Sequence, residues 1–275
     1  MGLQNLETLN LSNCINLEEV HHSLGFLKKL CTLKLTNCKW LKRFPVLCID
    51  SLEYLNLEGC SSLENFPEII GSMNLKLKSG IRCLDLRGLE NLVTLPSTIC
   101  KLKNLVELNV SACSKLESLP KEMGDLENLE WLDAKDTLIS QPPRSIVHLN
   151  KLHFLRFAKQ ESEVGLEDGV CFVFPPVSDG LRLLEILTLS YCNLIDGGLP
   201  EDIGFLSSLN ELCLCGNNFE HLPQSIAQLG SLRSLDLSEC RRLKEFLGVN
   251  VAKGLLSLYI LKLSNCNLID GGLPE

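Results

Sequence analysis

Cys213 and Cys215 are the residues of this chain whose type and spacing come closest to a chemical site. They are separated by one residue on a predicted strand, so both thiols should lie on the same face of it. Two thiols on one face could supply half of a tetrahedral zinc site. The flanking sequence offers only Asp236 as a third ligand, and we therefore interpret the pair as exposed thiols rather than as a metal site.

The other combinations of reactive residues are weaker still. The pair His21-His22 has no further ligand at zinc spacing. The chain contains no phosphate-binding G-x-x-x-x-G-K-[ST], no dinucleotide-binding G-x-G-x-x-G, no metalloprotease H-E-x-x-H and no nucleophile elbow G-x-S-x-G. The sequence therefore predicts no catalytic residue, no metal site and no cofactor, and we expect that the chain is not an enzyme.

The composition narrows the class of partner and the compartment. A formal net charge of −8 argues against binding nucleic acid or an anionic membrane through a basic face. The sequence has no run of about 18 apolar residues that could span a membrane. The 14 cysteines are fewer than the roughly 8–10% of residues typical of a disulfide scaffold, which favours reduced cysteines in a cytosolic protein.

A repeat organises the whole chain. The pattern L-x-x-L-x-L-x-x-C recurs eleven times with variation, at residues 6–14, 30–38, 52–60, 81–89, 105–113, 129–137, 152–160, 184–192, 209–217, 232–240 and 258–266. Most steps fall within the roughly 20–29 residues of a leucine-rich repeat, whose signature is nearly identical. Alternating leucines give each unit a short strand with one apolar face, which only stacked copies can bury.

Two further features of the repeat fix its geometry. The ninth position is small and should turn inward after the strand; it is Asn217 in one repeat and cysteine in seven, namely Cys14, Cys38, Cys60, Cys113, Cys192, Cys240 and Cys266. Recurrent Leu-Pro dipeptides in the return segments disfavour long helices. We expect an α/β solenoid, a leucine-rich-repeat horseshoe of about eleven repeats. Its parallel sheet should form the concave face, with short helical turns and coil on the convex face.

The limits of the array give the expected domain organisation. The first repeat begins near Met1 and the last breaks off at Glu275, within a repeat. Solenoids normally shield their ends with atypical repeats. We therefore expect one solenoid over residues 1–275 that is uncapped at both ends.

The variable positions of the repeat predict a binding surface. Trp131, Phe154 and Ile186 occupy the third position of three consecutive repeats, which should place them side by side on the concave face. Charged residues surround them in the adjoining columns, namely Asp133, Arg156 and Lys135. Aromatic anchors among charges are typical of interface hot spots. The alternative, that another part of the same polypeptide covers this patch, stays open.

The largest irregularity lies next to these residues. Repeat seven carries extra residues within 159–180, acidic first and then apolar around Pro175-Pro176, and a smaller irregularity lies at 73–80. Insertions in repeat proteins map to loops on one face and are often functional. We expect the 159–180 segment beside Phe154, flanking the same surface.

The joint cysteine and Leu-Pro pattern indicates a family. Segments such as LNVSACSKLESLPKEMGDLENLEWL (108–132) resemble the leucine-rich-repeat region of plant TIR-type nucleotide-binding disease-resistance receptors, over essentially the whole chain. The resemblance implies a cytoplasmic or nucleocytoplasmic immune receptor whose repeats bind pathogen effectors or restrain the nucleotide-binding module. It also implies that the uncapped array is part of a larger receptor. The TIR and nucleotide-binding domains of that family are not in this sequence, so their activities are not assigned to it.

Two alternative functions remain. The decapeptide CNLIDGGLPE, at 192–201 and 266–275, resembles the cysteine-containing repeats of F-box ubiquitin-ligase substrate receptors. The recurrent Leu-Pro segments count against that family. An extracellular receptor ectodomain is the second alternative, although the chain shows no signal peptide and no paired capping cysteines.

Overall fold

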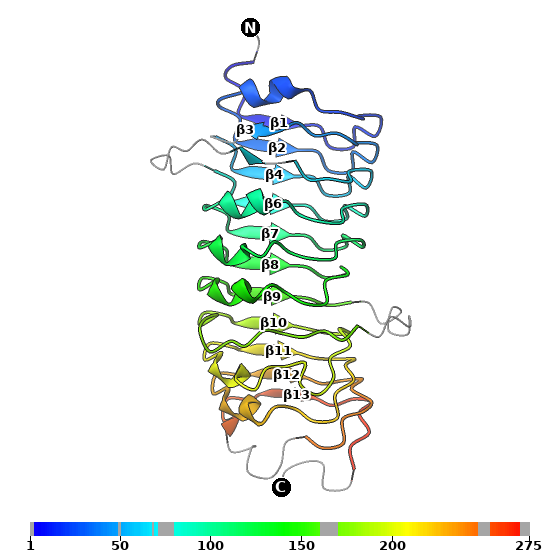
Figure 1. Ribbon diagram of the computed structural model, residues 1–275, viewed down its shortest axis with the longest axis vertical. Coiled ribbons are helices and arrows are strands. Elements are labelled where there is room, and N and C mark those ends of the chain that lie inside the picture. Colours follow the sequence, from blue (N-terminus) through cyan, green and yellow to red (C-terminus); the bar gives the residue numbers. More distant parts are fainter. Residues whose placement is uncertain are drawn as a thin grey trace. The chain divides into compact units, whose positions relative to one another are not determined.

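The structure is a computed structural model of the 275-residue chain and describes residues 3–48, 51–67, 69–70, 80–159, 170–246 and 254–269. It divides into two compact units, Met1–Ile139 and Ser140–Glu275. Both units are built from one element, a three-residue strand followed by a return segment (Figure 1).

The first unit contains six parallel strands that follow one another in sequence order: β1 (Thr8–Asn10), β2 (Thr32–Lys34), β4 (Tyr54–Asn56), β6 (Cys83–Asp85), β7 (Glu107–Asn109) and β8 (Trp131–Asp133). A second, two-stranded parallel sheet joins β3 (Leu47–Cys48) to β5 (Ile69–Ile70). The return segments carry short 3-10 helices: η1 (His22–Phe26), η2 (Ser97–Lys101) and η3 (Met123–Asp125).

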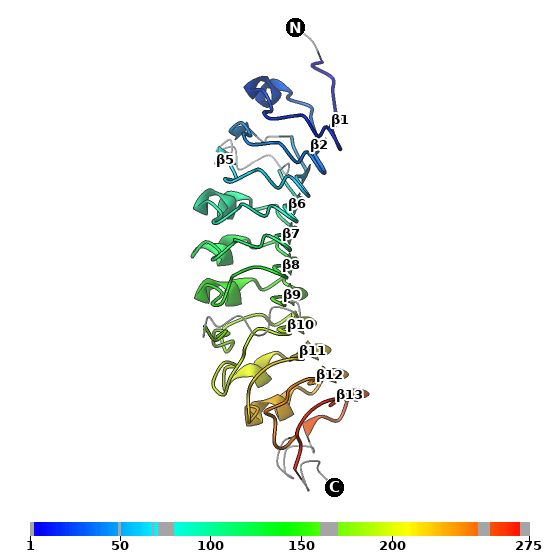
Figure 2. The same ribbon diagram turned by 90° about the vertical axis from the view of Figure 1, so that its right-hand side faces the viewer.

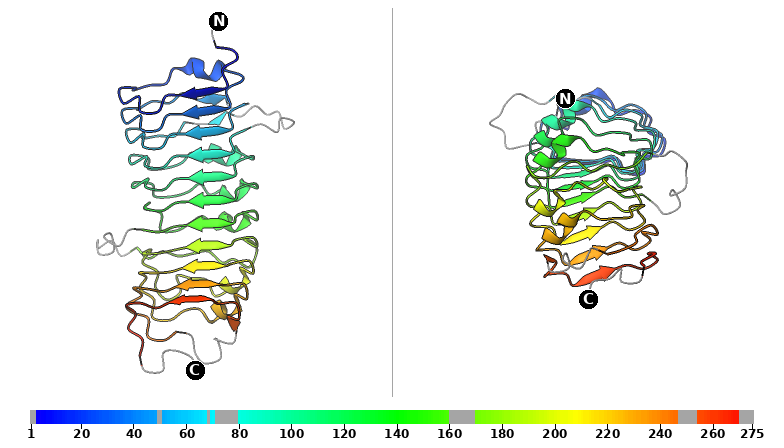
Figure 3. Two further views of the ribbon diagram at one scale, coloured as in Figure 1. Left: turned by 180° about the vertical axis from the view of Figure 1, so that it is seen from behind. Right: turned by 60° about the horizontal axis from the view of Figure 1, so that its bottom comes forward.

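The second unit repeats this plan with five parallel strands: β9 (Phe154–Arg156), β10 (Ile186–Thr188), β11 (Glu211–Cys213), β12 (Ser234–Asp236) and β13 (Ile260–Lys262). Its 3-10 helices are η4 (Arg144–His148), η6 (Ile203–Phe205) and η7 (Gln224–Gln228). Within each unit the strands stack in sequence order, as the view from behind shows (Figure 3). The strands lie along one side and the helical turns along the other (Figure 2).

The predicted leucine-rich-repeat architecture is confirmed. All eleven consensus segments form a strand, and each strand covers the third to fifth consensus positions. The return segments form helical turns of three to five residues, as the prolines predict. Pro96, Pro143 and Pro223 each lie directly before a 3-10 helix, where the missing amide donor costs nothing.

The core of each unit is a leucine stack with a thiol row beside it. Between the first and last repeats, the fourth- and sixth-position leucines, such as Leu84 and Leu86, are buried, whereas Leu9 of the first repeat is half-buried and Leu261 of the last is 37% exposed. The inner row is formed by the ninth-position residues, and five of its cysteines are buried: Cys38, Cys60, Cys113, Cys192 and Cys240. Cys14 belongs to the first repeat and is exposed, because burial of this position comes from the preceding repeat. The Cys113 thiol, for example, donates to the Leu86 carbonyl one repeat earlier, at 3.2 Å.

The insertion in repeat seven was expected to flank the exposed surface beside Phe154, but its described apolar part is buried. Residues 160–169 lie outside the described part of the chain, as do residues 73–79 of the smaller irregularity. The apolar half of the insertion is core rather than an exposed flank, since Phe172 and Phe174 are buried and the Phe172 ring lies 5.5 Å from that of Phe157. The Asp202 carboxylate fixes this segment by accepting the amide of Val177 at 3.0 Å.

Candidate protein-binding surface

The exposed sheet face, which carries the third and fifth consensus positions, is built by strand register. In the first unit the third-position residues are register partners from Thr8 to Trp131, and in the second unit from Phe154 to Ile260. The predicted columns are therefore confirmed within each unit. The leucine between the third and fifth positions points inward, so the variable residues point outward.

The predicted site residues fall into both units. Trp131 lies on β8 of the first unit with 42% of its surface exposed. Phe154 and Ile186 are register partners on β9 and β10 of the second unit. The Arg156 guanidinium lies 5.6 Å from the centre of the Phe154 ring, a cation–π distance. Phe154, Ile186 and Arg156 thus share one surface, and a single patch that also includes Trp131 stays a prediction.

Asp133 and Lys135 are less available than expected. Asp133 is only 4% exposed, and its carboxylate accepts the backbone amide of Lys135 at 3.0 Å. The Lys135 ammonium lies 3.7 Å from the Asp136 carboxylate. A buried carboxylate that satisfies a backbone donor has little surface left for a partner, so Asp133 acts mainly on the shape of the turn after β8.

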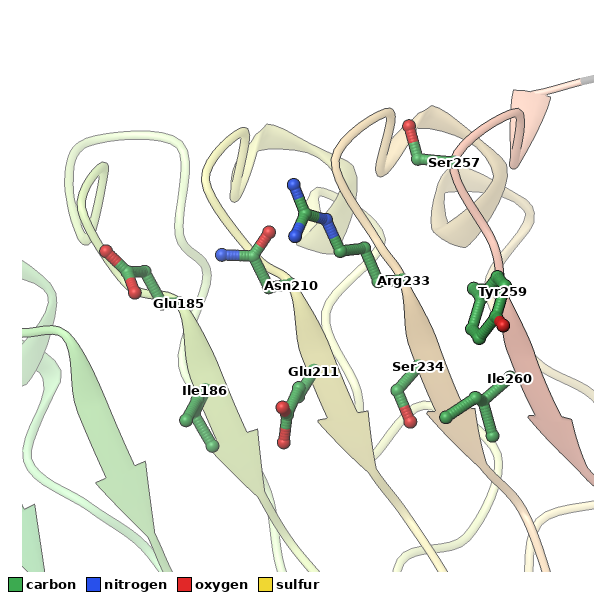
Figure 4. Close-up of a pocket in the computed structure, with 9 residues that line it drawn as sticks. All are labelled: Glu185, Ile186, Asn210, Glu211, Arg233, Ser234, Ser257, Tyr259 and Ile260. Carbon is green, nitrogen blue, oxygen red and sulfur yellow. The ribbon is translucent and has the colours of Figure 1, made fainter.

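A hollow of about 600 Å³ lies on the exposed sheet face of the second unit (Figure 4). Its size is within the roughly 300–1,000 Å³ of ordinary ligand sites. Side chains from β10 to β13 and from the turns that precede them line it: Glu185, Ile186, Asn210, Glu211, Arg233, Ser234, Ser257, Tyr259 and Ile260. Ile186 is the predicted site residue that contributes to this hollow.

The charges of the hollow are arranged in a row across neighbouring repeats. Glu185 is paired with His153, whose Nδ1 lies 3.1 Å from Oε1. Glu211 and Arg233 have exposed side chains that make no hydrogen bond or ion pair with any other residue the structure describes. In Figure 4 the Arg233 guanidinium extends toward Asn210, away from the Glu211 carboxylate. The hollow thus presents an acceptor and a bidentate donor that are both free for a partner.

Sequence patterns alone did not indicate this hollow. Glu211, Ser234 and Ile260 lie in the third-position column, but the hollow arises because the small Ser234 stands between larger neighbours. Arg233 precedes its strand, in the variable second position of the repeat. A comparison of side-chain volumes along the third-position column would have indicated a hollow at Ser234.

The described residues include neither a metal site nor a membrane span. No group of three or more histidine, cysteine, aspartate or glutamate side chains could hold a metal ion there. No helix in the same part of the chain is long and apolar enough to cross a membrane.

Comparisons with known proteins place these repeats in a family. The Leucine Rich Repeat family profile matches residues 51–73 and 183–206. TMV resistance protein N of Nicotiana glutinosa is 57% identical over 263 residues, which cover 89% of this chain and 22% of that protein. The chain is a run of leucine-rich repeats that is similar to part of these plant disease-resistance proteins. Disease resistance-like protein DSC1 of Arabidopsis thaliana is 38% identical, over 87% of this chain and 20% of that protein. The chain therefore spans about a fifth of the length of these relatives.

Solved structures agree on the fold. The functional domain of InlJ from Listeria monocytogenes, which includes a cysteine ladder, has a TM-score of 0.61 at 17% identity, covering 98% of this chain and 56% of that one. A leucine-rich-repeat protein of Leptospira interrogans has a TM-score of 0.52 at 24% identity, covering 98% and 81%. At this identity the likeness concerns the fold alone.

Proposed function

We propose that this chain is the protein-recognition region of an intracellular plant immune receptor, located in the cytoplasm or in both cytoplasm and nucleus. Its exposed sheet face binds a pathogen effector, restrains the receptor's own nucleotide-binding module, or does both in turn. Its role is binding rather than catalysis. The similarity to TMV resistance protein N over 89% of the chain supports the receptor class.

The observation that carries the proposal is the hollow in the second unit with its two unpaired charges. Glu211 lies on β11 and Arg233 directly precedes β12, and both side chains are exposed without an ion pair among the described residues, so a partner need not break an existing ion pair to use them. Arginine with neighbouring apolar side chains is typical of hot spots, and Ile186 and Ile260 supply that apolar surface. A protein surface with a carboxylate beside a basic side chain would complement both groups.

The test is affinity capture from plant cytosol, with and without added pathogen proteins, followed by affinity measurement on each captured protein. Three variants are compared with the unaltered chain. Glu211→Lys/Arg233→Glu reverses both charges of the hollow, and Trp131→Ala/Phe154→Ala removes the predicted aromatic anchors. Lys101→Glu, at the end of η2 on the helical side, is a control charge reversal away from the exposed sheet face.

The outcomes separate the functions. Capture of a pathogen protein or of the nucleotide-binding module, weakened at least about tenfold by the hollow variant and not by Lys101→Glu, supports recognition or restraint respectively. Equal affinity for all variants would remove the exposed face from the proposal. Recovery of ubiquitin-ligase subunits would instead favour the F-box alternative.

A further inference from the structure

Cys213 and Cys215 form a close thiol pair on the exposed sheet face of the second unit. Cys213 is the last residue of β11, and its Sγ lies 3.8 Å from the Sγ of Cys215. Both residues are half-buried rather than exposed, which corrects the expectation from the sequence. Two residues along an extended chain are roughly 6.6 Å apart, within the roughly 4.4–6.8 Å between Cα atoms that a disulfide spans.

The surroundings of the pair are polar and ordered. The buried Ser190 hydroxyl lies 3.1 Å from the Cys213 Sγ. Cys213 is followed in the same row of the sheet by Asp236 and Lys262, whose carboxylate and ammonium lie 3.1 Å apart. Lys262 thus places a positive charge in the row that carries the thiol. The Ser190 hydroxyl favours a thiolate at Cys213, whereas the Asp236 carboxylate, which is paired with Lys262, opposes it.

The turn that carries Cys215 is held in place. Gly216 has a φ of +68°, and a Cβ on it would lie 2.1 Å from the Tyr191 ring. The Tyr191 amide donates to the Cys215 carbonyl at 2.8 Å. The close ring and the backbone hydrogen bond keep the second thiol beside the first.

The two thiols differ in acidity. The hydrogen bond from Cys215, with help from the Ser190 hydroxyl, lowers the pKa of Cys213 to about 6 despite its partial burial. The same hydrogen bond and burial raise the pKa of Cys215. The pair therefore favours a thiolate at Cys213 over a thiolate at Cys215.

We propose that Cys213 and Cys215 form a redox-active dithiol that low-molecular-weight disulfides oxidise. The Cys213 thiolate attacks one sulfur of the small disulfide, breaks its S–S bond and releases one thiolate. Cys215 then gives up its proton to the released thiolate and attacks the Cys213 sulfur of the mixed disulfide. The second small thiol leaves, the Cys213–Cys215 bond forms, and the two electrons of the dithiol now reside in the two small thiols.

The test uses the full chain with oxidised glutathione at neutral pH and maps every cysteine-containing peptide by mass spectrometry. The unaltered chain is expected to lose two hydrogen masses in the peptide that contains both residues. Cys215→Ser is expected to stop at the mixed disulfide, with one glutathione on residue 213. Cys213→Ser is expected to form no internal disulfide, because Cys215 then has no partner thiol beside it.

Matched controls keep the result interpretable. Cys240→Ser alters a buried thiol of the next repeat and should leave the reaction at the pair unchanged. Circular dichroism and the thermal midpoint confirm that each variant is folded. A pair that stays reduced in the folded chain overturns the proposal, as does glutathione on Cys215 in preference to Cys213.

Discussion

The second unit contains cysteines in two kinds of position, the buried inner row and the exposed sheet face. The surroundings of Cys240 and Cys213 shift the thiol pKa in opposite directions. In the inner row, Cys240 is fully buried and donates its S–H to the Leu214 carbonyl at 3.3 Å. Burial raises its pKa to about 12. On the exposed sheet face, Cys213 lies one repeat away with a lowered pKa. Cys83 also lies on the exposed sheet face, but burial and a hydrogen bond to Glu107 raise its pKa to about 12. The groups around a thiol, rather than the residue type alone, therefore decide whether it packs or reacts.

Asn217 extends this comparison, because it fills the inner row where other repeats have cysteine. Its amide nitrogen donates to the carbonyls of Leu189 and Leu214 at 2.8 and 2.7 Å, and its oxygen accepts the amides of Cys192 and Leu194 at 3.1 and 3.0 Å. The residue is fully buried, and all four hydrogen bonds that its side chain can form are made within the protein. The inner row therefore contributes stability in two ways, through apolar packing and through hydrogen bonds.

The largest effect is expected from Asn217→Leu. The substitution leaves two amides and two carbonyls in the core without this partner, at about 1–3 kcal/mol for each group that finds no other. We expect the free energy of unfolding to fall by about 4 kcal/mol, measured by urea denaturation followed by circular dichroism. Asn217→Cys, which restores the common residue of the row, should cost less. A loss below about 1 kcal/mol for the leucine variant would contradict this account.

The second largest effect is expected in the rate at which Cys213 and Cys240 are alkylated. At pH 7 a thiol with a pKa near 6 is mostly thiolate, whereas one with a pKa near 12 is almost entirely protonated. A thiolate of low pKa is a weaker nucleophile, which offsets part of the difference in thiolate fraction between the two thiols. We expect iodoacetamide to modify Cys213 at least about a hundredfold faster than Cys240 in the folded chain, as measured by peptide mapping over time.

The pH profile of that alkylation tests the cause. Because the pKa of Cys213 is lowered, the thiolate persists as the pH falls and is lost only below about 6. The rate should be nearly constant above pH 7 and fall about tenfold per unit well below pH 6. Cys215, Ser190, Asp236 and Lys262 are the groups that face this thiol. A midpoint near the ordinary value of about 8.5 would show that they do not act on it.

Structural features that are set within a single repeat can be predicted from the sequence. The period of leucines is local, so strands such as Glu211–Cys213 and the short turns after Leu-Pro were predicted correctly. The register columns followed from the same period. The inner row was also predicted, except that Cys14 of the first repeat is exposed and Cys266 of the last described repeat is half-buried.

Features that depend on several repeats at once were not predictable. The hollow exists because Ser234 is small beside Glu211 and Ile260, a comparison across three strands. Asp133 was expected at the surface, but the turn after β8 buries it. The sequence predicts a loop at Phe172 and Phe174. In a lengthened repeat the spacing no longer indicates which apolar residues fill the core, and both side chains are in fact buried.

The smallest effect is a direct comparison of two alanine substitutions in neighbouring repeats. Cys240→Ala removes a fully buried sulfur and leaves a small cavity beside Leu214, so we expect a loss of about 1–2 kcal/mol in unfolding free energy. Cys213→Ala removes a half-buried sulfur from the exposed face and should change it by about 0.5 kcal/mol or less. Urea denaturation of both variants under reducing conditions gives the two values. Equal losses would mean that the exposed thiol is also a packing residue, and the division between a stabilising inner row and a reactive outer face would then fail.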